Sequence, residues 1–279
     1  MSATIAMLTD FGITDAYVGV MKAVMKRIKP DVDFVDITHD IQPQNVRQGA
    51  FVLFNSYRYF APGTIFVAVV DPGVGGTRKP IAAYVGDYTF VAPDNGILSY
   101  VLSEFASPTI VELTNLMYQQ SSVSYTFHGR DIFAPAAAHL ASGVAIQNLG
   151  PLVDRLYKQL LPTIRTSDTQ ISGNVLHSDR FGNVVTSIGE LKWIENHRLL
   201  LSPRFGAREA TQIIMPTTAT VKVKDVRVGS IRRTYSEAGR SEMLALVDSN
   251  GFLEVAINQG NATKQHNFAA GDPVVIELK

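Results

Sequence analysis

Apolar runs recur at regular intervals along the first half of the chain. The run from Ile65 to Val70 is continuously apolar, which is typical of a strand buried on both faces of a parallel sheet. Further apolar runs predict strands at Ile5 to Leu8, Phe34 to Ile37, Ile81 to Val85, Tyr88 to Val91 and Ile110 to Leu113. Because polar, glycine- or proline-containing segments separate these runs, we interpret them as the strands of one sheet.

Helical repeats lie between these strands. One repeat places apolar residues at Tyr17, Val20, Met21, Val24 and Ile28. A second places them at Val46, Ala50, Leu53, Phe54 and Tyr57. We expect Thr14 or Asp15 to cap the first helix and Pro30 to end it, with further helices after Asp94 and Asp131. Alternation of strands and helices predicts a layered α/β domain with a mostly parallel sheet.

The pattern changes from about Ile171, where short alternating segments dominate. These segments predict strands at Thr220 to Val226, Met243 to Val247, Phe252 to Ile257 and Val274 to Leu278. Turn residues separate them, as in Phe181-Gly182-Asn183 and Gly271-Asp272-Pro273. This half is therefore predicted to be an antiparallel, β-barrel-like domain. A polar stretch after Pro162 places the boundary there, giving domains at 1–165 and 166–279.

Composition narrows the classes of partner. Lys and Arg total 25, and Asp and Glu also total 25, so no net field attracts nucleic acid or an anionic membrane. The chain has no cysteine, which excludes disulfides and a thiol nucleophile. No apolar run approaches the roughly 20 residues that span a bilayer. The start of the chain also lacks the basic region and the cleavage site of a secretory signal. We expect a soluble, cytoplasmic protein without nucleic-acid or membrane partners.

Three polar clusters stand where an α/β sheet binds ligands, beyond strand ends and before helices. The first contains Asp10 and Asp15, which suit ribose hydroxyls but also suit a turn and a helix start. The second runs from Asp71 to Arg78 through three glycines, and is either a plain turn or a loop that pairs the two charges. The third contains His128, with glycine beside it and charges after it.

Several familiar chemistries are unsupported. The loop after Asp71 matches neither phosphate-binding fingerprint, and no G-x-S-x-G segment is present. The six histidines show no ligand spacing, and His139 lies in an alanine-rich helix where packing is the favoured interpretation. A metal site is therefore not expected. In the second half, Asp179 to Asn183 and Asp248 to Gly251 are explained locally as turns.

Taken in order, the clusters resemble a known family. The segments that carry the resemblance are TDFGITDAYVGVMK, DITHDI, VVDPGVGGTR, APDNGIL, FHGRDIFAPAAAHLA, SDRFGNVVTSI and NGFLEVAINQGNA. Together they are similar to the S-adenosyl-L-methionine hydroxide adenosyltransferases, relatives of the fluorinases and chlorinases. The resemblance implies an N-terminal α/β domain and a C-terminal β-barrel-like domain. It also implies a homotrimer whose active sites lie where one subunit's N-terminal domain meets a neighbour's C-terminal domain, with no cofactor.

The resemblance also implies residue roles. It assigns hydrolysis to Asp71, Arg78 and His128. It assigns substrate binding to Asp10, Asp15, Asp179, Phe181, Asn183, Ser249 and Asn250. Asp10 would hold the ribose hydroxyls, Asn183 and Phe181 the adenine, Asp179 the methionine ammonium and Ser249 its carboxylate. The halogenating relatives have arginine where this chain has Asn250.

The implied reaction is hydrolysis of S-adenosyl-L-methionine at the ribose C5′, giving adenosine and L-methionine. Asp71 is the residue that separates this from halogenation, because the halogenases carry tyrosine there and a carboxylate repels a halide. The insertion typical of fluorinases is also absent after Arg78. A non-catalytic sensor of S-adenosylmethionine or adenosine is a third hypothesis, but it would not need Asp71, Arg78 and His128 together.

Overall fold

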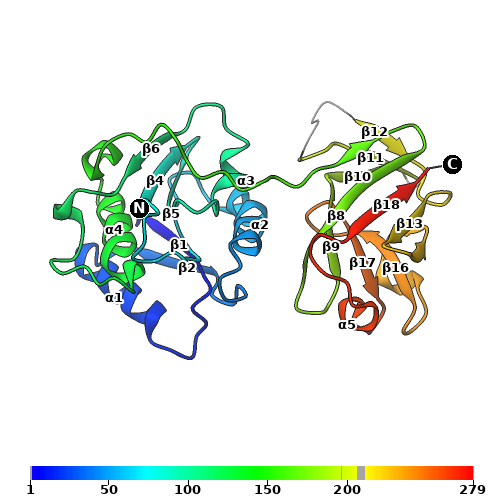
Figure 1. The fold of residues 1–279 in the computed structure, drawn as a ribbon, viewed down its shortest axis with the longest axis horizontal. Helices are drawn as coiled ribbons and strands as arrows, with labels where there is room; N and C mark the ends of the chain where they lie inside the picture. The colour runs from blue at the N-terminus through cyan, green and yellow to red at the C-terminus, as the bar shows by residue number, and fades with distance from the viewer. Residues whose placement is uncertain (1, 196, 206–210, 279) are drawn as a thin grey trace. The chain divides into compact units, whose positions relative to one another are not determined.

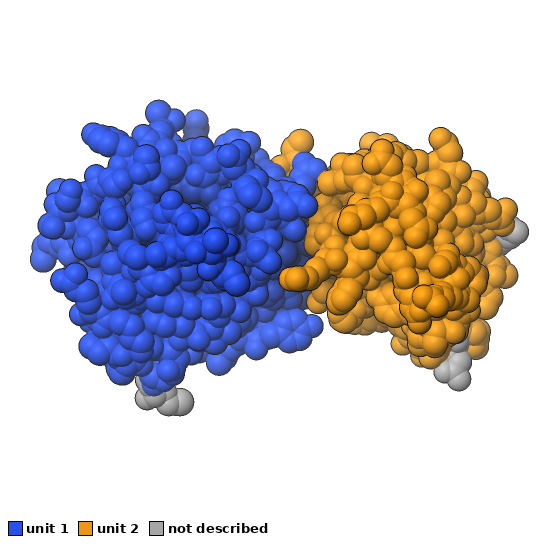
Figure 2. All heavy atoms as spheres, turned by 90° about the horizontal axis from the view of Figure 1, so that it is seen from below, with its two compact units in different colours: residues 1–159 blue, residues 160–279 orange. Residues whose placement is uncertain are grey.

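The computed structural model describes residues 2–195, 197–205 and 211–278. The chain forms two compact units, Met1–Gln159 (unit 1) and Leu160–Lys279 (unit 2), shown in blue and orange in Figure 2. The sequence predicts this division a few residues further on, between 165 and 166. Each unit has its own hydrophobic core, made of buried aliphatic and aromatic side chains.

Unit 1 is built on one sheet with the strand order β2-β1-β3-β5-β4-β6 (Figure 1). Its strands are β1 (Thr4–Thr9), β2 (Asp33–Thr38), β3 (Ile65–Val69), β4 (Pro80–Val85), β5 (Tyr88–Pro93) and β6 (Thr109–Glu112). β1 pairs in parallel with β2 and β3, and β3 with β5, whereas β4 runs antiparallel to β5 and β6. The predicted mostly parallel sheet is confirmed.

Helices cover both faces of this sheet (Figure 1). α1 (Tyr17–Ile28) and α4 (Ala134–Ala141) pack on one face, where Met21 joins Ile5 in the core. α2 (Val46–Ser56) and α3 (Ser99–Leu102) lie on the other, where an added Cβ at Gly49 would lie 3.2 Å from Val70. Shorter helical turns are η1 (Tyr57–Tyr59), η2 (Leu116–Tyr118), η3 (Gly129–Phe133) and η4 (Ile146–Leu149). Unit 1 is thus a three-layer α/β/α domain.

The start of α1 differs from the sequence prediction. Its N-cap is Ala16 and no side chain caps it, so the expectation of a cap from Thr14 or Asp15 was wrong. Tyr17, which the apolar repeat places in the core, is 48% exposed. Its ring instead lies beside Phe11, with 5.8 Å between ring centroids. The residues before α1 therefore form a loop that carries aromatic rings, rather than a capped helix start.

Unit 2 is dominated by strands. One sheet has the order β14-β13-β18-β8-β9-β17-β16-β15, with β7 beside β8, and a smaller sheet has the order β10-β11-β12. Among the described strands the pairs are antiparallel except β15 with β16. β14 and β16 also lie close together, so the large sheet is nearly closed and barrel-like. The elements are β7 (Arg165–Thr166), β8 (Gln170–Ser178), β9 (Val184–Gly189), β10 (Leu191–Glu195), β11 (Arg198–Leu201), β12 (Gln212–Ile214), β13 (Thr220–Val223), β14 (Val226–Gly229), β15 (Ile231–Arg232), η5 (Tyr235–Glu237), β16 (Met243–Val247), β17 (Phe252–Ile257), α5 (Ala262–His266) and β18 (Pro273–Glu277).

One predicted strand of unit 2 is a hairpin. The segment Thr220 to Val226 divides into β13 and the start of β14, which pair antiparallel. Lys224 turns the chain with a φ of +52°. Valines alternate with polar residues on both sides of the turn, and the one sign of the break is that Val223 and Val226 are three residues apart instead of two. Elsewhere, no helix in the described part of the chain is long and apolar enough to span a membrane.

Candidate active site

The carboxyl ends of β1 and β3 lie next to each other in unit 1. Thr9 pairs with Val69 at the ends of these two parallel strands. Asp10 follows Thr9 directly, and Asp71 stands two residues after Val69. Because ligands of α/β sheets bind beyond the carboxyl ends of strands, these two carboxylates lie at the edge of the sheet where a ligand is expected.

Asp71 and Arg78 form an ion pair across the glycine-rich loop. Arg78 Nε donates to Asp71 Oδ1 at 3.0 Å, and Arg78 Nη2 donates to Asp71 Oδ2 at 2.5 Å. The two side chains are only 5% and 9% exposed, respectively. A guanidinium that binds a carboxylate through two nitrogens fixes the orientation of both groups. The loop therefore pairs the two charges, which is one of the two outcomes that the sequence allows.

Gly75 shows why this loop requires glycine. Its φ is +74°, and an added Cβ would lie 2.2 Å from the carbonyl oxygen of Tyr125. Neither the backbone conformation nor the available space suits a side chain. The loop thus packs through its backbone against the segment that leads to His128. The tight glycine turn and the loop that pairs Asp71 with Arg78 are therefore one and the same structure.

His128 completes the cluster. Its Nδ1 lies 2.7 Å from Arg78 Nη2. Because a guanidinium donates but cannot accept, Nδ1 must be the acceptor, and a neutral ring then carries its proton on Nε2. Burial lowers the pKa of His128, and the Arg78 charge lowers it further, against smaller opposing effects of Asp71 and Asp131. The imidazole is therefore neutral near pH 7.

Asp131 anchors the segment that carries His128. It is 1% exposed, its Oδ2 accepts the N–H of Ser124 at 2.8 Å, and its Oδ1 accepts from Arg130 Nε at 2.7 Å. Between Ser124 and Asp131 the chain enters η3, a π-helical turn of a kind that is frequent at functional sites. No sequence motif marks Asp131 as an anchor, although a carboxylate ahead of an apolar helix is a signal that could have been followed.

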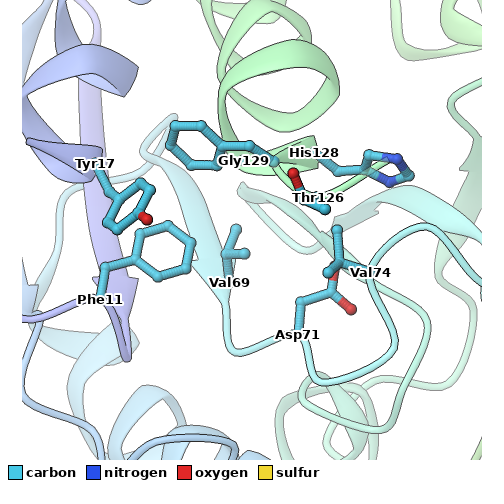
Figure 3. Close-up of a pocket in the computed structure, with 9 residues that line it drawn as sticks. Phe11, Tyr17, Val69, Asp71, Val74, Thr126, His128 and Gly129 are labelled. Atoms are coloured by element: carbon cyan, nitrogen blue, oxygen red, sulfur yellow. The ribbon is translucent and has the colours of Figure 1, made fainter. Parts of the chain in front are cut away.

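A pocket of about 130 Å³ opens beside the cluster (Figure 3). Asp71 and His128 lie toward one end of it, and Phe11 and Tyr17 toward the other. The ring of Phe127 meets those of Phe11 and Tyr17 edge-on, at centroid distances of 5.9 and 5.1 Å. The pocket thus joins a polar end to an aromatic end. Reasoning from charged strand ends misses these rings, and only their nearness in sequence to Asp10 and His128 could have indicated them.

Asp10 and Asp15 differ in their surroundings. Asp10 Oδ2 accepts the backbone N–H of Gln44 at 2.7 Å, and Gln44 adopts a φ of +67°. Asp15 is exposed, and among the described residues its side chain has no hydrogen bond or ion pair. Asp10 is therefore held in place in unit 1, whereas no described residue of that unit fixes the Asp15 carboxylate.

In unit 2, Asp179 organises the turn between β8 and β9. Its Oδ1 accepts the N–H groups of Phe181 at 2.9 Å and of Asn183 at 2.8 Å, and its Oδ2 lies 3.1 Å from the donating Asn183 Nδ2. Phe181 is 75% exposed, whereas Asn183 is buried. The local explanation as a turn is correct, and it leaves an exposed ring and a buried amide side by side.

A second turn of unit 2 lies between β16 and β17. Asp248 Oδ1 accepts the N–H of Asn250 at 2.8 Å, while Ser249 is exposed. Burial raises the pKa of Asp248, and the Asp179 charge adds to the rise, which places the two carboxylates near each other. Burial likewise raises the pKa of Glu254 to about 7. Among the described residues, none of these three carboxylates has an ion-pair partner.

The candidates therefore form two sets. Asp71, Arg78, His128 and Asp10 belong to unit 1, and the turns at 179–183 and 248–250 belong to unit 2. His139 is not part of either set, since its ring lies 5.0 Å from that of Tyr118. Within the described ranges, no group of three His, Asp or Glu side chains is arranged to hold a metal ion.

A three-layer α/β domain with a charged cluster at its strand ends, followed by a barrel-like β domain, defines the class of protein. Residues 5–150 match the N-terminal domain of the SAM hydroxide adenosyltransferases, and residues 173–275 match the C-terminal domain. The chain belongs to this family.

Individual relatives agree over almost the whole length. The chain is 36% identical to a protein of Thermus thermophilus named (R)-S-adenosyl-L-methionine hydrolase, covering 96% of each chain. A crystal structure of a conserved protein from Thermotoga maritima aligns with a TM-score of 0.83 at 34% identity, covering 98% of this chain and 99% of that one. A fluorinase of Nocardia brasiliensis is 27% identical, covering 98% of this chain and 96% of the fluorinase.

Proposed function

We propose that this protein hydrolyses S-adenosyl-L-methionine at the ribose C5′, releasing adenosine and L-methionine. The family of the chain and the names of its relatives support this activity. The observation that carries the proposal is the cluster of Asp71, Arg78 and His128 beside a pocket in unit 1. The substrate suits such a cluster, because its sulfonium leaves as a neutral thioether and only the nucleophile is lacking.

Asp71 orients the attacking water. Arg78 Nε donates to both carboxylate oxygens and Nη2 donates to Oδ2, so Oδ1 is the oxygen that retains capacity for a further hydrogen bond. A water bound there turns an O–H toward the carboxylate and so directs a lone pair away from it. Placing that lone pair in line with the C5′–sulfur bond removes much of the entropic barrier to attack. As the C–O bond forms, the proton shared with Asp71 passes to it.

Arg78 and His128 keep Asp71 in this state. The guanidinium binds the carboxylate through two nitrogens, and its contact with Nδ1 ties His128 to the same unit. Among the described residues Arg78 Nη1 has no hydrogen-bond partner, so it is the donor left to stabilise hydroxide character on the water. This assigns Arg78 two roles and leaves His128 as the neutral acceptor that orients it.

The remaining parts of the substrate are assigned to the other candidates. Asp10 Oδ1, which has no partner among the described residues, takes the ribose hydroxyls, with Asp15 in the same loop. Asp179 pairs with the methionine ammonium, since among the described residues no cation pairs with Asp179 or with its neighbours Asp248 and Glu254. Asn183 and Phe181 bind adenine, and Ser249 and Asn250 bind the methionine carboxylate. Asn250 contributes no charge, so hydrogen bonds alone hold that carboxylate.

The assembly completes the proposal. Because the two sets of candidates lie in different units, we propose a homotrimer in which the N-terminal domain of one subunit meets the C-terminal domain of another. We also propose the cytoplasm as its location. The reaction needs no metal or redox cofactor, since the sulfonium is already an activated leaving group.

Halogenation is the alternative that the fluorinase relatives raise. The Asp71 carboxylate disfavours it, because repulsion of a halide at contact costs on the order of 1 kcal/mol or more. A sensor that only binds the substrate is disfavoured by the presence of a complete Asp-Arg-His cluster.

Product analysis tests the proposal. The protein is incubated separately with the R and S sulfonium epimers of S-adenosyl-L-methionine, with and without chloride. We expect adenosine and methionine as the products with and without chloride. We also expect faster turnover of the R epimer, for which the Thermus thermophilus relative is named. A 5′-chloroadenosine product would instead establish a halogenase. Tight binding of unchanged substrate would establish a sensor.

A further inference from the structure

A buried histidine connects the ends of β1 and β2 behind Asp10. His39, just after β2, is 6% exposed. Its Nδ1 lies 2.8 Å from the hydroxyl of Thr9, the last residue of β1, and its Nε2 lies 3.1 Å from Asp36 Oδ1. Thr9 is fully buried and immediately precedes Asp10. The mechanism proposed above makes no use of this group of three side chains.

The polar contacts of the group continue from Asp36 to Lys22. Lys22 Nζ donates to Asp36 Oδ2 at 2.6 Å. Burial opposes ionisation of Asp36, but the Lys22 and His39 contacts outweigh it and keep its pKa below the usual value. The Asp36 carboxylate can only accept, and its place 3.1 Å from Nε2 favours the tautomer with the proton on Nε2, which leaves Nδ1 to accept from the Thr9 hydroxyl.

The same hydroxyl fixes the loop that begins at Asp10. Thr9 Oγ1, whose O–H donates a hydrogen bond to His39, accepts the N–H of Phe11 at 3.3 Å. The backbone carbonyl of His39 accepts the N–H of Gly12 at 2.8 Å. Both contacts hold the backbone on the far side of Asp10. Asp10 lies between Thr9 and these two contacts, so the chain is held on both sides of it.

An irregularity in the sheet makes these contacts reachable. The pairing of β1 with β2 shifts register between Met7 and Leu8, so that Leu8 pairs with Thr38 and Ile37 is skipped. A bulge of this kind re-aims the side chains that follow it, and here it precedes His39. The chain then continues to Gln44, whose N–H donates to Asp10 Oδ2. The segment from Asp36 to Gln44 therefore holds the Asp10 carboxylate directly, and it holds Thr9 and Gly12 on either side of Asp10.

We propose that the Asp36–His39–Thr9 network positions the Asp10 carboxylate for the hydroxyls of the ribose. His39 and Thr9 are positioning residues, since neither is assigned a contact with substrate. This inference rests on the proposed function, which gives the ribose to Asp10. A role in packing alone would depend on side-chain volume, whereas positioning depends on the Thr9 hydroxyl.

Binding of two nucleosides to the full-length protein tests the inference. Calorimetry gives the Kd of adenosine and of 2′,3′-dideoxyadenosine, and their ratio measures recognition of the hydroxyls without any turnover. Hydrogen bonds to a carboxylate predict a ratio of about 10 or more in the unaltered protein. Thr9→Val preserves the volume but removes the hydroxyl, and should lower the ratio to about 3 or less. Thr9→Ser restores the hydroxyl and should restore the ratio.

Matched variants separate the possible failures. Asp10→Asn should lower the ratio as Thr9→Val does, and combining the two should lower it no further. His139→Gln, at a histidine outside both candidate sets, should leave it unchanged. A full ratio in folded Thr9→Val, or equal loss in Thr9→Ser, overturns the positioning role while hydrolysis stands. A Kd ratio in Asp10→Asn equal to that of the unaltered protein would mean that Asp10 does not bind the ribose hydroxyls, and it would also overturn the positioning role. Absence of both hydrolysis and adenosine binding in the unaltered protein overturns the proposed function itself.

Discussion

The carboxylate clusters of the two units differ in whether a cation balances their charge. In unit 1, Asp71 is neutralised by Arg78 from the same loop, and the pair is buried. In unit 2, burial raises the pKa of Asp248 and of Glu254, the Asp179 charge adds to both shifts, and no described Lys or Arg pairs with these three carboxylates. The first arrangement is complete before any ligand arrives, whereas the second holds negative charge that lacks a counterion.

This difference indicates a division of labour. A pre-paired cluster suits catalysis, because its groups need no reorganisation during the reaction. Unpaired carboxylates suit binding, because an incoming ammonium relieves repulsion that the folded protein already carries. Changes in the Asp71–Arg78–His128 cluster of unit 1 should therefore act mainly on kcat, and changes at the unpaired carboxylates of unit 2 mainly on KM or on stability.

The largest effect should follow loss of the Asp71 charge. Asp71→Asn keeps the shape of the side chain but leaves Arg78 unpaired and removes the proton acceptor. We expect kcat to fall by about 1,000-fold or more while adenosine binding persists. Steady-state kinetics and calorimetry measure the two quantities. Asp87→Asn, an exposed position in the turn before β5, is the control and should keep full activity. Comparable rates in both variants would remove Asp71 from the mechanism.

A smaller effect should follow the matching change in unit 2. Asp179→Asn retains an oxygen that can accept the N–H groups of Phe181 and Asn183, so the turn should persist. The charge offered to the ammonium is lost, together with the hydrogen bond that Asn183 Nδ2 donates to Asp179 Oδ2. We expect KM to rise by about 10- to 100-fold with kcat nearly unchanged. A fall in kcat with constant KM would contradict the division between the units.

Much of unit 1 follows from sequence because its signals are local. The run from Ile65 to Val70 is apolar throughout because β3 is buried on both faces, and the ordered motifs identify Asp71, Arg78 and His128 before any contact is seen. The aromatic end of the pocket and the Thr9–His39 contact could not be predicted in this way. They depend on the approach of chain segments far apart in sequence, and on a register shift that leaves the apolar pattern intact.

Stability should report the unpaired charge of unit 2. Glu254 is buried, and its pKa of about 7 compares with 4.5 for a free side chain. As pH rises, the unfolded chain releases this proton first, so stability is lost between about 4.5 and about 7 and stays lost above. Glu254→Gln retains an acceptor for the Tyr235 hydroxyl and should stabilise the protein by about 2 kcal/mol at pH 8.

Urea unfolding of both proteins at pH 5 and pH 8 measures this effect. The gain from Glu254→Gln should be confined to the higher pH. An equal gain at both values would mean that the substitution acts through packing and not through charge.

The pH dependence of activity should report His128. Its pKa lies below 6.5, so the neutral ring that accepts from Arg78 is lost only in acid. We expect kcat/KM to be level near neutrality and to fall in acid, below the lowered pKa of His128, approaching tenfold per pH unit. His128→Asn offers Arg78 an oxygen that does not titrate, and should weaken or remove this acid limb. An unchanged limb in that variant would assign it to another group.

The central claim is that a water held by Asp71 attacks the ribose C5′, and an isotope experiment tests it most directly. A single turnover is run in water enriched in heavy oxygen, and the products are analysed by mass. We expect one heavy oxygen at the 5′-hydroxyl of adenosine and none in methionine. The Asp71→Asn variant should give no product on the same timescale. Labelled homoserine with 5′-methylthioadenosine would place the attack on the methionine chain and contradict the account.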